Sequence, residues 1–271
     1  MAKAILDPIT RHLLDSAGHH GPLALMYHSV QKLDRTPSWP WAVSRKQFQN
    51  HLDLLQGEGW TTCTIHQLLS RHAEDPGRTI VITFDDGFLD NLWAAEMLER
   101  RGMRASWFVV TGSVGKTPSW EDTGRPSGRM LDRTDLRTIA GAGMEIGSHS
   151  RSHLRLPTLG DQALRDEVSG SKATLEEMLG STVRSFSYPY GDWDSRCEAI
   201  VRLAGYKAAC TTSTGMAMKD KDPLRIRRLT ICNTDDTRRF ARKLGLASND
   251  GGWGPALRYV GRRIMARAGL R

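Results

Sequence analysis

Apolar residues along the chain form short continuous runs that alternate with segments of helical periodicity. The runs at 23–27, 79–84 and 105–110 have the length and the aliphatic, β-branched or aromatic composition of buried strands. Between such runs, apolar residues recur every three or four positions, as in the segment 48–55, which predicts amphipathic helices. This alternation predicts parallel βαβ units in an α/β fold, arranged either as a barrel or as an open sheet.

Capping and turn residues set the expected boundaries of these elements. Ser44 followed by Gln47 is a capping-box signature, and it opens a helix that ends near Gly57. The segment 112–128 is rich in Gly, Ser, Thr and Pro, so we expect a loop over one face. The same signals predict further strands at 61–64, 144–148, 185–188, 208–210 and 228–231, and further helices at 65–71, 89–101, 132–140, 161–179, 195–204 and 235–246.

The size and composition of the chain are those of one ordinary globular unit. It has 271 residues, of which 39% are hydrophobic and 25% are charged. We expect an N-terminal extension at 1–22, a main folded unit at 23–246 and a basic C-terminal tail at 247–271. The sequence shows neither an apolar stretch of membrane-spanning length nor a secretory apolar run, which favours a cytoplasmic location. Its four cysteines lack C-x-x-C spacing, so we expect them to be reduced and to bind no metal.

The formal net charge of +8 weakly favours anionic partners. Much of the excess lies in the tail, where 253–265 has the pattern of a basic amphipathic helix. Such a helix either contacts an anionic membrane face or docks on the body with its basic face in solvent. The chain has no recognised nucleic-acid-binding motif and no interleaved aromatic residues, so nucleic acid is not an expected partner.

Two adjacent carboxylates end the predicted strand at 79–84. Asp85 and Asp86 cannot both lie unpaired in the core, because burying a bare charge is very costly. Adjacent residues on an extended backbone point in different directions, so one carboxylate could bind a metal while the other acts as a base. The alternative is a plain turn in which an aspartate caps the following helix.

Two histidines four positions apart follow the predicted strand at 144–148. His149 and His153 could share one face of a helical turn and bind the same ion. With one carboxylate they form a ligand set suited to zinc, with a position left for water. A pair of surface histidines is the alternative. Because His28, the two aspartates and His149 all directly follow predicted strands, we expect them to meet at one edge of the fold.

The segment Phe186–Gly191 is the third element with chemical potential. Pro189 favours an extended conformation at Tyr188, and Gly191 permits a sharp turn. Such a turn can direct the Tyr190 N–H into a cleft as an oxyanion donor. The alternative is a simple strand-to-helix turn with packing aromatic residues.

These motifs, at 83–87, 149–153 and 188–191, resemble in their order those of the NodB-homology polysaccharide deacetylases (carbohydrate esterase family 4). The resemblance covers about 23–231, most of the chain. It implies a distorted (β/α) barrel of about seven parallel strands and metal-dependent removal of N-acetyl groups from amino sugars. It also implies roles for individual residues: Asp85 as general base, Asp86, His149 and His153 as metal ligands, and Tyr190 as the donor of an oxyanion-binding N–H.

The chain departs from the family pattern at two places. Where the family often has an arginine that orients the base, this chain has Ser187, and Arg228 or, less favoured, Arg184 could replace it. The late Leu-x-His motif that usually supplies the acid is also missing. The run at 25–29 looks instead like the biofilm-polysaccharide deacetylase branch, whose N-terminal histidine serves as acid, which implies this role for His28. A histidine that merely caps a strand end is the alternative.

The resemblance implies a divalent metal cofactor, with zinc expected and cobalt, nickel, iron or manganese as alternatives. The expected partner is an N-acetylated amino-sugar oligo- or polysaccharide of exopolysaccharide type, or a lipid-linked or nucleotide-linked precursor. Tyr188 and Trp193 are predicted to contact the sugar. Other tryptophans could also stack on sugar rings, although some must be core (Trp39, Trp41, Trp107, Trp120). The remaining histidines are expected to be solvated (His19, His20, His51, His66, His72).

Two other functions remain open at this point. One is a different amide hydrolase on the same scaffold, such as a deformylase of a lipid-linked amino sugar. The other is an inactive carbohydrate-binding barrel that keeps the fold without the chemistry.

Overall fold

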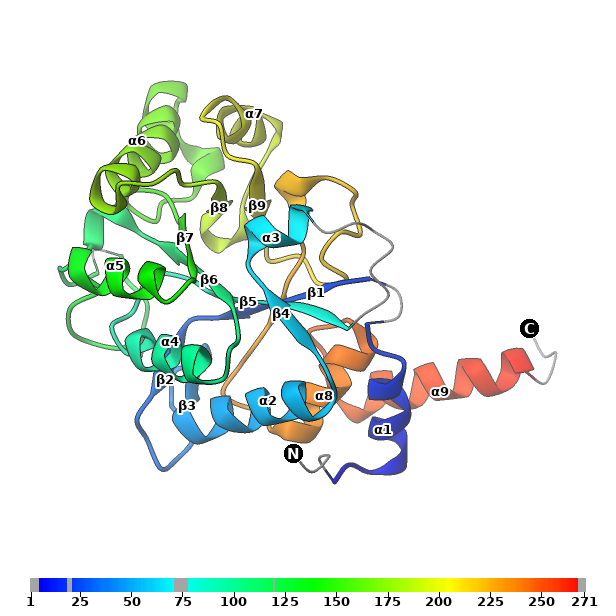
Figure 1. Cartoon of the computed structure of the whole chain (residues 1–271). Coiled ribbons are helices and arrows are strands. Elements are labelled where there is room, and N and C mark those ends of the chain that lie inside the picture. The colour runs from blue at the N-terminus through cyan, green and yellow to red at the C-terminus, as the bar shows by residue number, and fades with distance from the viewer. Residues whose placement is uncertain (1–4, 19–20, 71–77, 119, 268–271) are drawn as a thin grey trace.

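The computed structural model describes residues 5–18, 21–70, 78–118 and 120–267, with side chains up to 261. Its centre is a curled sheet of parallel strands in the order β10-β1-β5-β6-β7-β8-β9, with β4 paired to β5 (Figure 1). Seven strands thus follow one another around the curl, which confirms the predicted α/β fold. The strands are β1 (Leu23–Tyr27), β4 (Thr61–Cys63), β5 (Thr79–Phe84), β6 (Ala105–Val109), β7 (Glu145–Ser148), β8 (Ser185–Ser187), β9 (Ala208–Cys210) and β10 (Leu229–Thr230).

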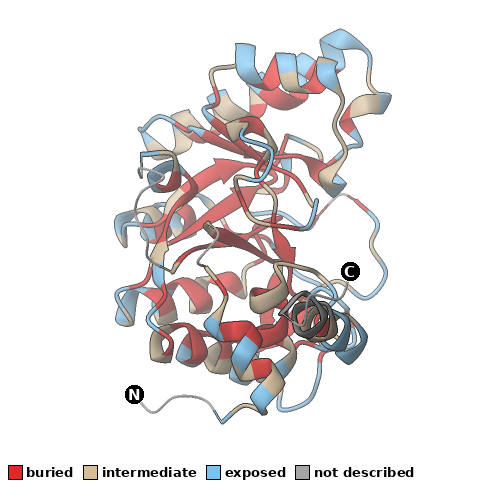
Figure 2. Cartoon of the chain, turned by 90° about the vertical axis from the view of Figure 1, so that its right-hand side faces the viewer, coloured by how far each residue is buried: buried red, intermediate tan, exposed pale blue. Residues whose placement is uncertain are grey.

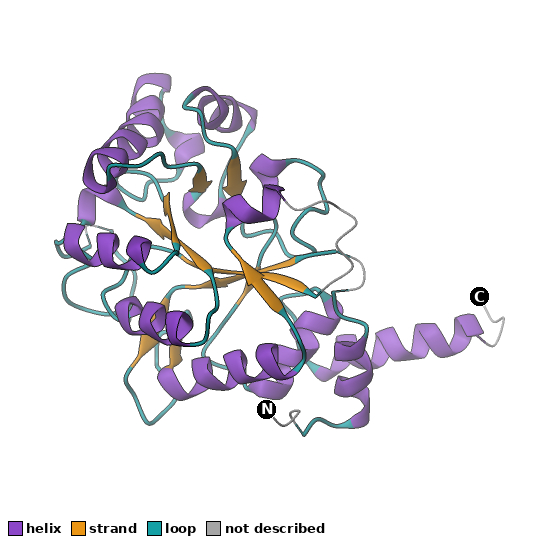
Figure 3. Ribbon diagram, in the orientation of Figure 1, coloured by secondary structure: helices purple, strands orange, loops and turns teal. Residues whose placement is uncertain are grey.

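Helices surround this sheet (Figure 3). The helices from α2 to α8 follow the predicted segments closely, because their apolar positions are buried. The helix bounds are α1 (Pro8–Asp15), α2 (Arg45–Gly57), α3 (Ile65–Ser70), α4 (Asn91–Arg100), α5 (Arg133–Gly141), α6 (Asp161–Leu179), α7 (Ser195–Leu203), α8 (Thr237–Leu246) and α9 (Trp253–Arg267).

The core lies on both faces of the strands (Figure 2). Every residue of β5 is buried, as its continuous apolar pattern predicts. Phe84 at the end of β5 stacks on Trp107 with ring centroids 4.6 Å apart, and both side chains are fully buried. Trp107 is therefore a core residue and not a sugar-binding one.

Three features of the fold were not predicted, and the first is the N-terminal helix α1. Residues Ser29–Gln31 (β2) and Ala42–Ser44 (β3) form a separate two-stranded parallel sheet next to the end of β1. At the start of α2, Ser44 caps the helix as expected by accepting from the Gln47 N–H. The Gln47 side chain does not complete the capping box, because it donates instead to the main-chain oxygen of Asp235 at 2.8 Å.

The prediction that His51 is a solvated surface residue is wrong. Its side chain is fully buried in α2 and stacks on Phe240 with ring centroids 4.1 Å apart. Burial lowers the pKa of His51 to about 4, against the opposing effect of the Asp235 carbonyl. His66 is exposed as expected, whereas His19, His20 and His72 lie outside the described residues.

The helices nearest the two ends of the described chain, α1 and α9, are in contact. In the predicted N-terminal extension, α1 packs against α8, and its Leu13 and Leu14 are fully buried. The helix α9 leaves the body of the molecule beyond the buried Ala256 (Figure 1). No helix in the described ranges has the length and apolar character required to cross a bilayer.

Candidate active site

The carboxyl ends of neighbouring strands bring the three motifs together. The N–H of Asp85 donates to Tyr27 O at the end of β1, and the N–H of His149 donates to Val109 O at the end of β6. These bonds continue the sheet ladder by one residue, so the strands fix where each functional side chain starts. Asp85, Asp86 and His149 are all at most 4% exposed.

Asp85 is held in place by the guanidinium of Arg228. The two terminal nitrogens of Arg228 donate to Asp85 Oδ1 at 2.6 Å and Oδ2 at 2.8 Å, a bidentate pair. The same side chain donates to Thr83 Oγ1, Ser187 Oγ and Thr211 O, so all five of its N–H groups are used. Arg228 is fully buried, and of the two arginines that the sequence offered as partners of Asp85 it is the one in contact with this carboxylate.

Electrostatics keep Asp85 ionised. Burial alone would raise the pKa of its carboxyl, but the charge and hydrogen bonds of Arg228, together with His149 and His28, outweigh burial and hold the pKa well below its usual range. Ser187 stands where the family often has arginine, and its hydroxyl lies 3.3 Å from Asp85 Oδ2. The small side chain leaves room for Arg228 to reach the carboxylate from β10. Arg184, the other predicted arginine, is exposed.

The second carboxylate faces two imidazoles. Asp86 Oδ1 lies 3.5 Å from His149 Nε2 and 3.4 Å from His153 Nε2. One donor atom from each of these residues lies within 4.8 Å of the other two. Two ligands on one tetrahedral zinc, each bonded at about 2.0–2.1 Å, are about 3.3 Å apart, so the spacing fits a single ion.

The polar atoms of this triad also fit a divalent metal. Asp86 Oδ1 is buried and has no hydrogen-bond partner among the described residues. Burial, reinforced by the charges of Asp85 and Asp122, raises the pKa of Asp86, so its ionised form is costly unless a cation binds there. His149 Nδ1 lies 2.8 Å from Ser187 O, and a carbonyl only accepts, so Nδ1 carries the proton and Nε2 keeps its lone pair for a ligand bond.

The backbone that carries these ligands is not the helical turn expected for 149–153. Ser150 and His153 have φ angles of 63° and 57°, in the left-handed region, within a loop. The prediction was wrong because local bonds favour the loop: the His153 N–H donates to Ser150 Oγ, and Glu167 accepts two further N–H groups of the loop. Asp86 and Tyr190 are left-handed too, at 72° and 60°. Such conformations cluster at functional sites.

The turn at 189–191 brings Tyr190 next to the triad. Its ring centroid lies 4.5 Å from that of His153, and no acceptor for its N–H is found among the described residues. Gly191 has a φ of 75°, and a Cβ there would lie 2.0 Å from Thr212 Oγ1, so only glycine fits this turn. The guanidinium of Arg155 lies over the Tyr190 ring and forms an ion pair with Asp192.

His28 lies at the end of β1, half-buried between two tryptophans. Its ring centroid is 5.8 Å from that of Trp39 and 6.1 Å from that of Trp41. Its Nδ1 is buried without a hydrogen-bond partner in the described structure. Burial lowers the pKa of His28 to about 4, although the charge of Asp85 acts in the opposite direction.

The two aromatic residues predicted to contact sugar lie in different surroundings. Tyr188 is fully buried against Phe186, so its side chain is not exposed to a ligand here. Trp193 is partly exposed, and Arg225 covers its ring at 4.5 Å. Trp41, at 38% exposed, is the more accessible tryptophan beside the site.

The sequence did not predict where two residues lie beside the metal-ligand triad: it offered Trp120 only as a possible sugar-stacking residue and gave Glu167 no role. Trp120, on the 112–128 loop, lies 4.6 Å from the His153 ring, and the loop's sequence carries no signal for that position. Glu167 is buried and holds the 150–153 loop. Its place on the apolar side of α6, between Leu164 and Ser171, is a signal that could have identified it.

Comparison with known proteins gives one consistent result. The sequence model of the family described as "Polysaccharide deacetylase" matches residues 72–209, just over half of the chain. YxkH of Bacillus subtilis (strain 168), which bears a polysaccharide-deacetylase name, is 27% identical over 211 residues, or 76% of this chain and 70% of YxkH. Chitin deacetylase 1 of Cryptococcus neoformans is 28% identical over 162 residues, or 58% of this chain and 31% of that protein.

Solved structures show the same fold. IcaB from Ammonifex degensii matches with a TM-score of 0.69 at 25% identity, over 78% of this chain and 92% of IcaB. The Streptococcus pyogenes deacetylase PplD, solved with acetate, also has a TM-score of 0.69, at 22% identity over 79% of this chain and 94% of PplD.

Proposed function

Because the chain belongs to the polysaccharide deacetylase family, we propose that it hydrolyses the N-acetyl group of an amino sugar with one divalent metal ion, zinc being expected. The observation that carries this proposal is the juxtaposition of two carboxylates with different surroundings. Asp85 is ionised and fixed by Arg228, while Asp86, with His149 and His153, offers three donor atoms to one ion.

The bound ion would be held by Asp86, His149 and His153, and it would polarise the acetamide carbonyl and acidify an attacking water. Asp85 accepts the proton of that water, since it is ionised at neutral pH and cannot rotate away from Arg228. The N–H of Tyr190 donates to the carbonyl oxygen as negative charge develops there.

His28 gives a proton to the departing amine, which would otherwise leave as an unstable anion. With a pKa of about 4, His28 is neutral in the free protein at pH 7. His28 must therefore take up a proton before it can donate one. Placement at the end of β1, the neighbour of β5 in the sheet, supports this role.

The substrate is proposed to be an N-acetylhexosamine unit of an exopolysaccharide or of its lipid-linked or nucleotide-linked precursor. Similarity to a chitin deacetylase supports a polymer of this type as the first substrate to test. Trp41, Trp193 and Tyr190, which are the accessible aromatic side chains nearby, are proposed to pack on sugar rings.

The decisive experiment measures acetate release from chitooligosaccharides by metal-free and zinc-loaded protein. We expect release only with the ion, and none from Asp85→Asn, although this variant still binds zinc because Asp85 is not a proposed ligand. Zinc binding without acetate or formate release from any amino-sugar substrate would favour the inactive barrel. Release of formate alone would favour a deformylase.

A cytoplasmic location and contact of the 247–271 tail with an anionic membrane are also proposed. Trp253 and Leu257 lie one turn apart on α9 and are 48% and 55% exposed, and the tail contains five arginines and one aspartate. Trp253→Ser/Leu257→Ser is expected to lose co-sedimentation with phosphatidylserine vesicles. Equal sedimentation with neutral phosphatidylcholine vesicles, or no effect of the variant, would contradict the membrane contact.

A further inference from the structure

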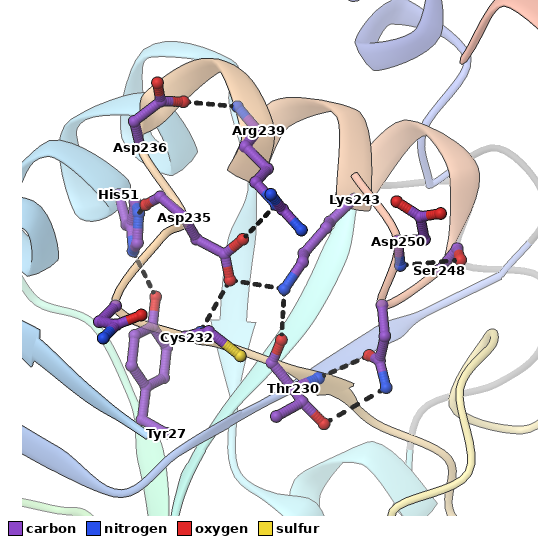
Figure 4. Close-up of polar contacts among 12 residues, drawn as sticks. Tyr27, His51, Thr230, Cys232, Asp235, Asp236, Arg239, Lys243, Ser248 and Asp250 are labelled. Carbon is purple, nitrogen blue, oxygen red and sulfur yellow. Dashed lines mark hydrogen bonds and ion pairs between the residues drawn. The ribbon is translucent and has the colours of Figure 1, made fainter. Parts of the chain in front are cut away.

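The strand β10 is an edge strand of the curled sheet, and it pairs along its length with β1. The Ile231 N–H donates to Met26 O on that side, so the N–H and C=O of Thr230 point to the opposite, open side. There Asn249 Oδ1 accepts the Thr230 N–H at 2.8 Å, and Lys243 Nζ donates to Thr230 O at 2.7 Å (Figure 4). Side chains from α8 and the segment after it thus complete the hydrogen bonds of the edge strand.

Lys243 belongs to a buried polar network. Its side chain is 2% exposed, and its ammonium lies 2.5 Å from Oδ2 of the fully buried Asp235. The same oxygen accepts the Cys232 N–H at 2.8 Å, and Arg239 Nε lies 3.3 Å from the other oxygen. Asp235 therefore fixes α8 to the segment that leaves β10.

The network continues to the neighbouring strand β1. The main-chain oxygen of Asp235 lies 2.6 Å from His51 Nε2, and His51 Nδ1 lies 3.0 Å from the Tyr27 hydroxyl. Since a carbonyl only accepts, Nε2 carries the proton and Nδ1 accepts from Tyr27. Tyr27 directly precedes His28, and the other end of the network holds β10 just after Arg228.

Buried ion pairs contribute little net stability compared with apolar side chains of similar volume, but they can specify one geometry. Arg228 requires one geometry, because both of its terminal nitrogens must meet the Asp85 carboxylate. We propose that Lys243, Asp235 and Asn249 are positioning residues for deacetylation, which fix β10 and thereby the guanidinium of Arg228. This inference rests on the proposed function, since the three residues act through Arg228 and not on the substrate.

The contacts of Lys243, Asp235 and Asn249 that hold β10 are called the β10 clamp below. Two variants remove parts of this clamp in different ways. Asn249→Ala removes a contact to Thr230 without leaving a buried charge, and Asp235→Asn/Lys243→Met removes both charges while keeping similar volumes. Each is expected to lower kcat roughly tenfold with KM and zinc content unchanged, because the base is displaced and the ligands are not. Leu13→Ala is the matched control, since Leu13 is a fully buried residue of α1, which packs against α8. It lowers stability but leaves the kcat of the folded enzyme unchanged.

A double-mutant cycle separates positioning from general damage. If the β10 clamp acts through Arg228, Asn249→Ala changes kcat by less than about twofold in an Arg228→Lys background. Equal losses in the two backgrounds, or a similar loss of kcat in Leu13→Ala, would overturn the inference.

A second readout does not depend on activity. The Arg228 Nε–H donates to Thr211 O at 3.0 Å, and its hydrogen exchange is measurable by NMR after ¹⁵N-arginine labelling. We expect roughly tenfold faster exchange or more in Asn249→Ala and wild-type exchange in Leu13→Ala. Unchanged exchange in Asn249→Ala refutes the β10 clamp whatever the activity, whereas faster exchange in a protein without deacetylase activity refutes only the proposed function.

Discussion

Two regions of the molecule bury an aspartate beside basic side chains, and they treat its charge in opposite ways. The oxygens of Asp235 face the Lys243 ammonium at 2.5 Å and the Arg239 guanidinium at 3.3 Å. Among the described residues, Asp86 Oδ1 has no cation in contact, only the imidazole nitrogens of His149 and His153 at 3.4–3.5 Å. The first region supplies its own cations, although Asp235 Oδ1 accepts no hydrogen bond from the described residues, whereas the second needs a positive charge from outside the described chain.

This difference shows that burial of a carboxylate does not by itself mark a functional site. A buried carboxylate without a cation in contact is the better indication of such a site. The same contrast separates adjacent residues within the site, since Asp85 has its cation in Arg228 and Asp86 has none. A carboxylate with its own cation is suited to a fixed role, and one without is suited to bind a metal.

Loss of a metal ligand is expected to have the largest effect. His153→Ala should lower kcat/KM for acetate release by on the order of a thousandfold or more and abolish zinc binding, because two donors remain of three. Measurement of bound metal and of acetate release checks both effects. His66→Ala, at an exposed histidine remote from the triad, is the control and should change neither. Wild-type zinc content in His153→Ala would remove the distinction between the two regions.

Removal of one charge from the Asp235 region should reduce stability. Lys243→Met leaves Asp235 buried without its ammonium, so the free energy of unfolding should fall by about 3–5 kcal/mol. Asp235→Asn/Lys243→Met should recover most of that loss, because no unpaired charge remains. Urea unfolding of the three proteins measures the difference. A double variant no more stable than the single one would show that the pair contributes through contacts other than charge.

The pH dependence of stability tests the His51 part of the network. Its pKa is lowered to about 4 from 6.5, so the unfolded chain binds the proton more readily between these values. Stability from neutral His51 is therefore present above pH 6.5 and is lost as pH falls towards 4, by about 3 kcal/mol. His51→Gln keeps a donor for Asp235 O and an acceptor for Tyr27 without titrating there. Urea unfolding at several pH values should show a shallower acid loss for His51→Gln, and identical profiles would contradict the assignment.

Neutralising either aspartate of the site should change the free energy of unfolding of the metal-free protein only modestly, with opposite signs for Asp85 and Asp86. In the metal-free protein, Asp86→Asn should raise the free energy of unfolding by about 1 kcal/mol, since it removes a buried, unpaired carboxylate. Asp85→Asn should lower the same quantity, because it leaves Arg228 without its partner. Thermal unfolding without metal measures both. Destabilisation by Asp86→Asn would mean that this carboxylate is already compensated.

The fold was largely predictable because strands that are buried on both faces appear as continuous apolar runs in the sequence. The small β2–β3 sheet was missed, since neither Ser29–Gln31 nor Ala42–Ser44 forms an apolar run. His51 was misplaced because its helix looks amphipathic, and only the packing of α8 shows that the polar position is covered.

The sequence predicted which residues lie together at the site better than it predicted how they are arranged. Strand ends placed Asp85, Asp86 and His149 at one edge, and the sequence left two arginines for the base, of which the structure brings only Arg228 into contact. The helical turn for 149–153 was wrong because spacing carries no information on left-handed residues such as Ser150. Loop contacts such as Trp120 on His153 depend on the path of a segment without periodicity.

Anomalous diffraction at the zinc edge from crystals grown with zinc shows where the ion binds. We predict one peak per chain, about 2.0–2.2 Å from a carboxylate oxygen of Asp86 and from Nε2 of both His149 and His153. Asp85 should remain paired with Arg228. The absence of a peak there, or a peak bonded to Asp85 instead of Asp86, would contradict the account.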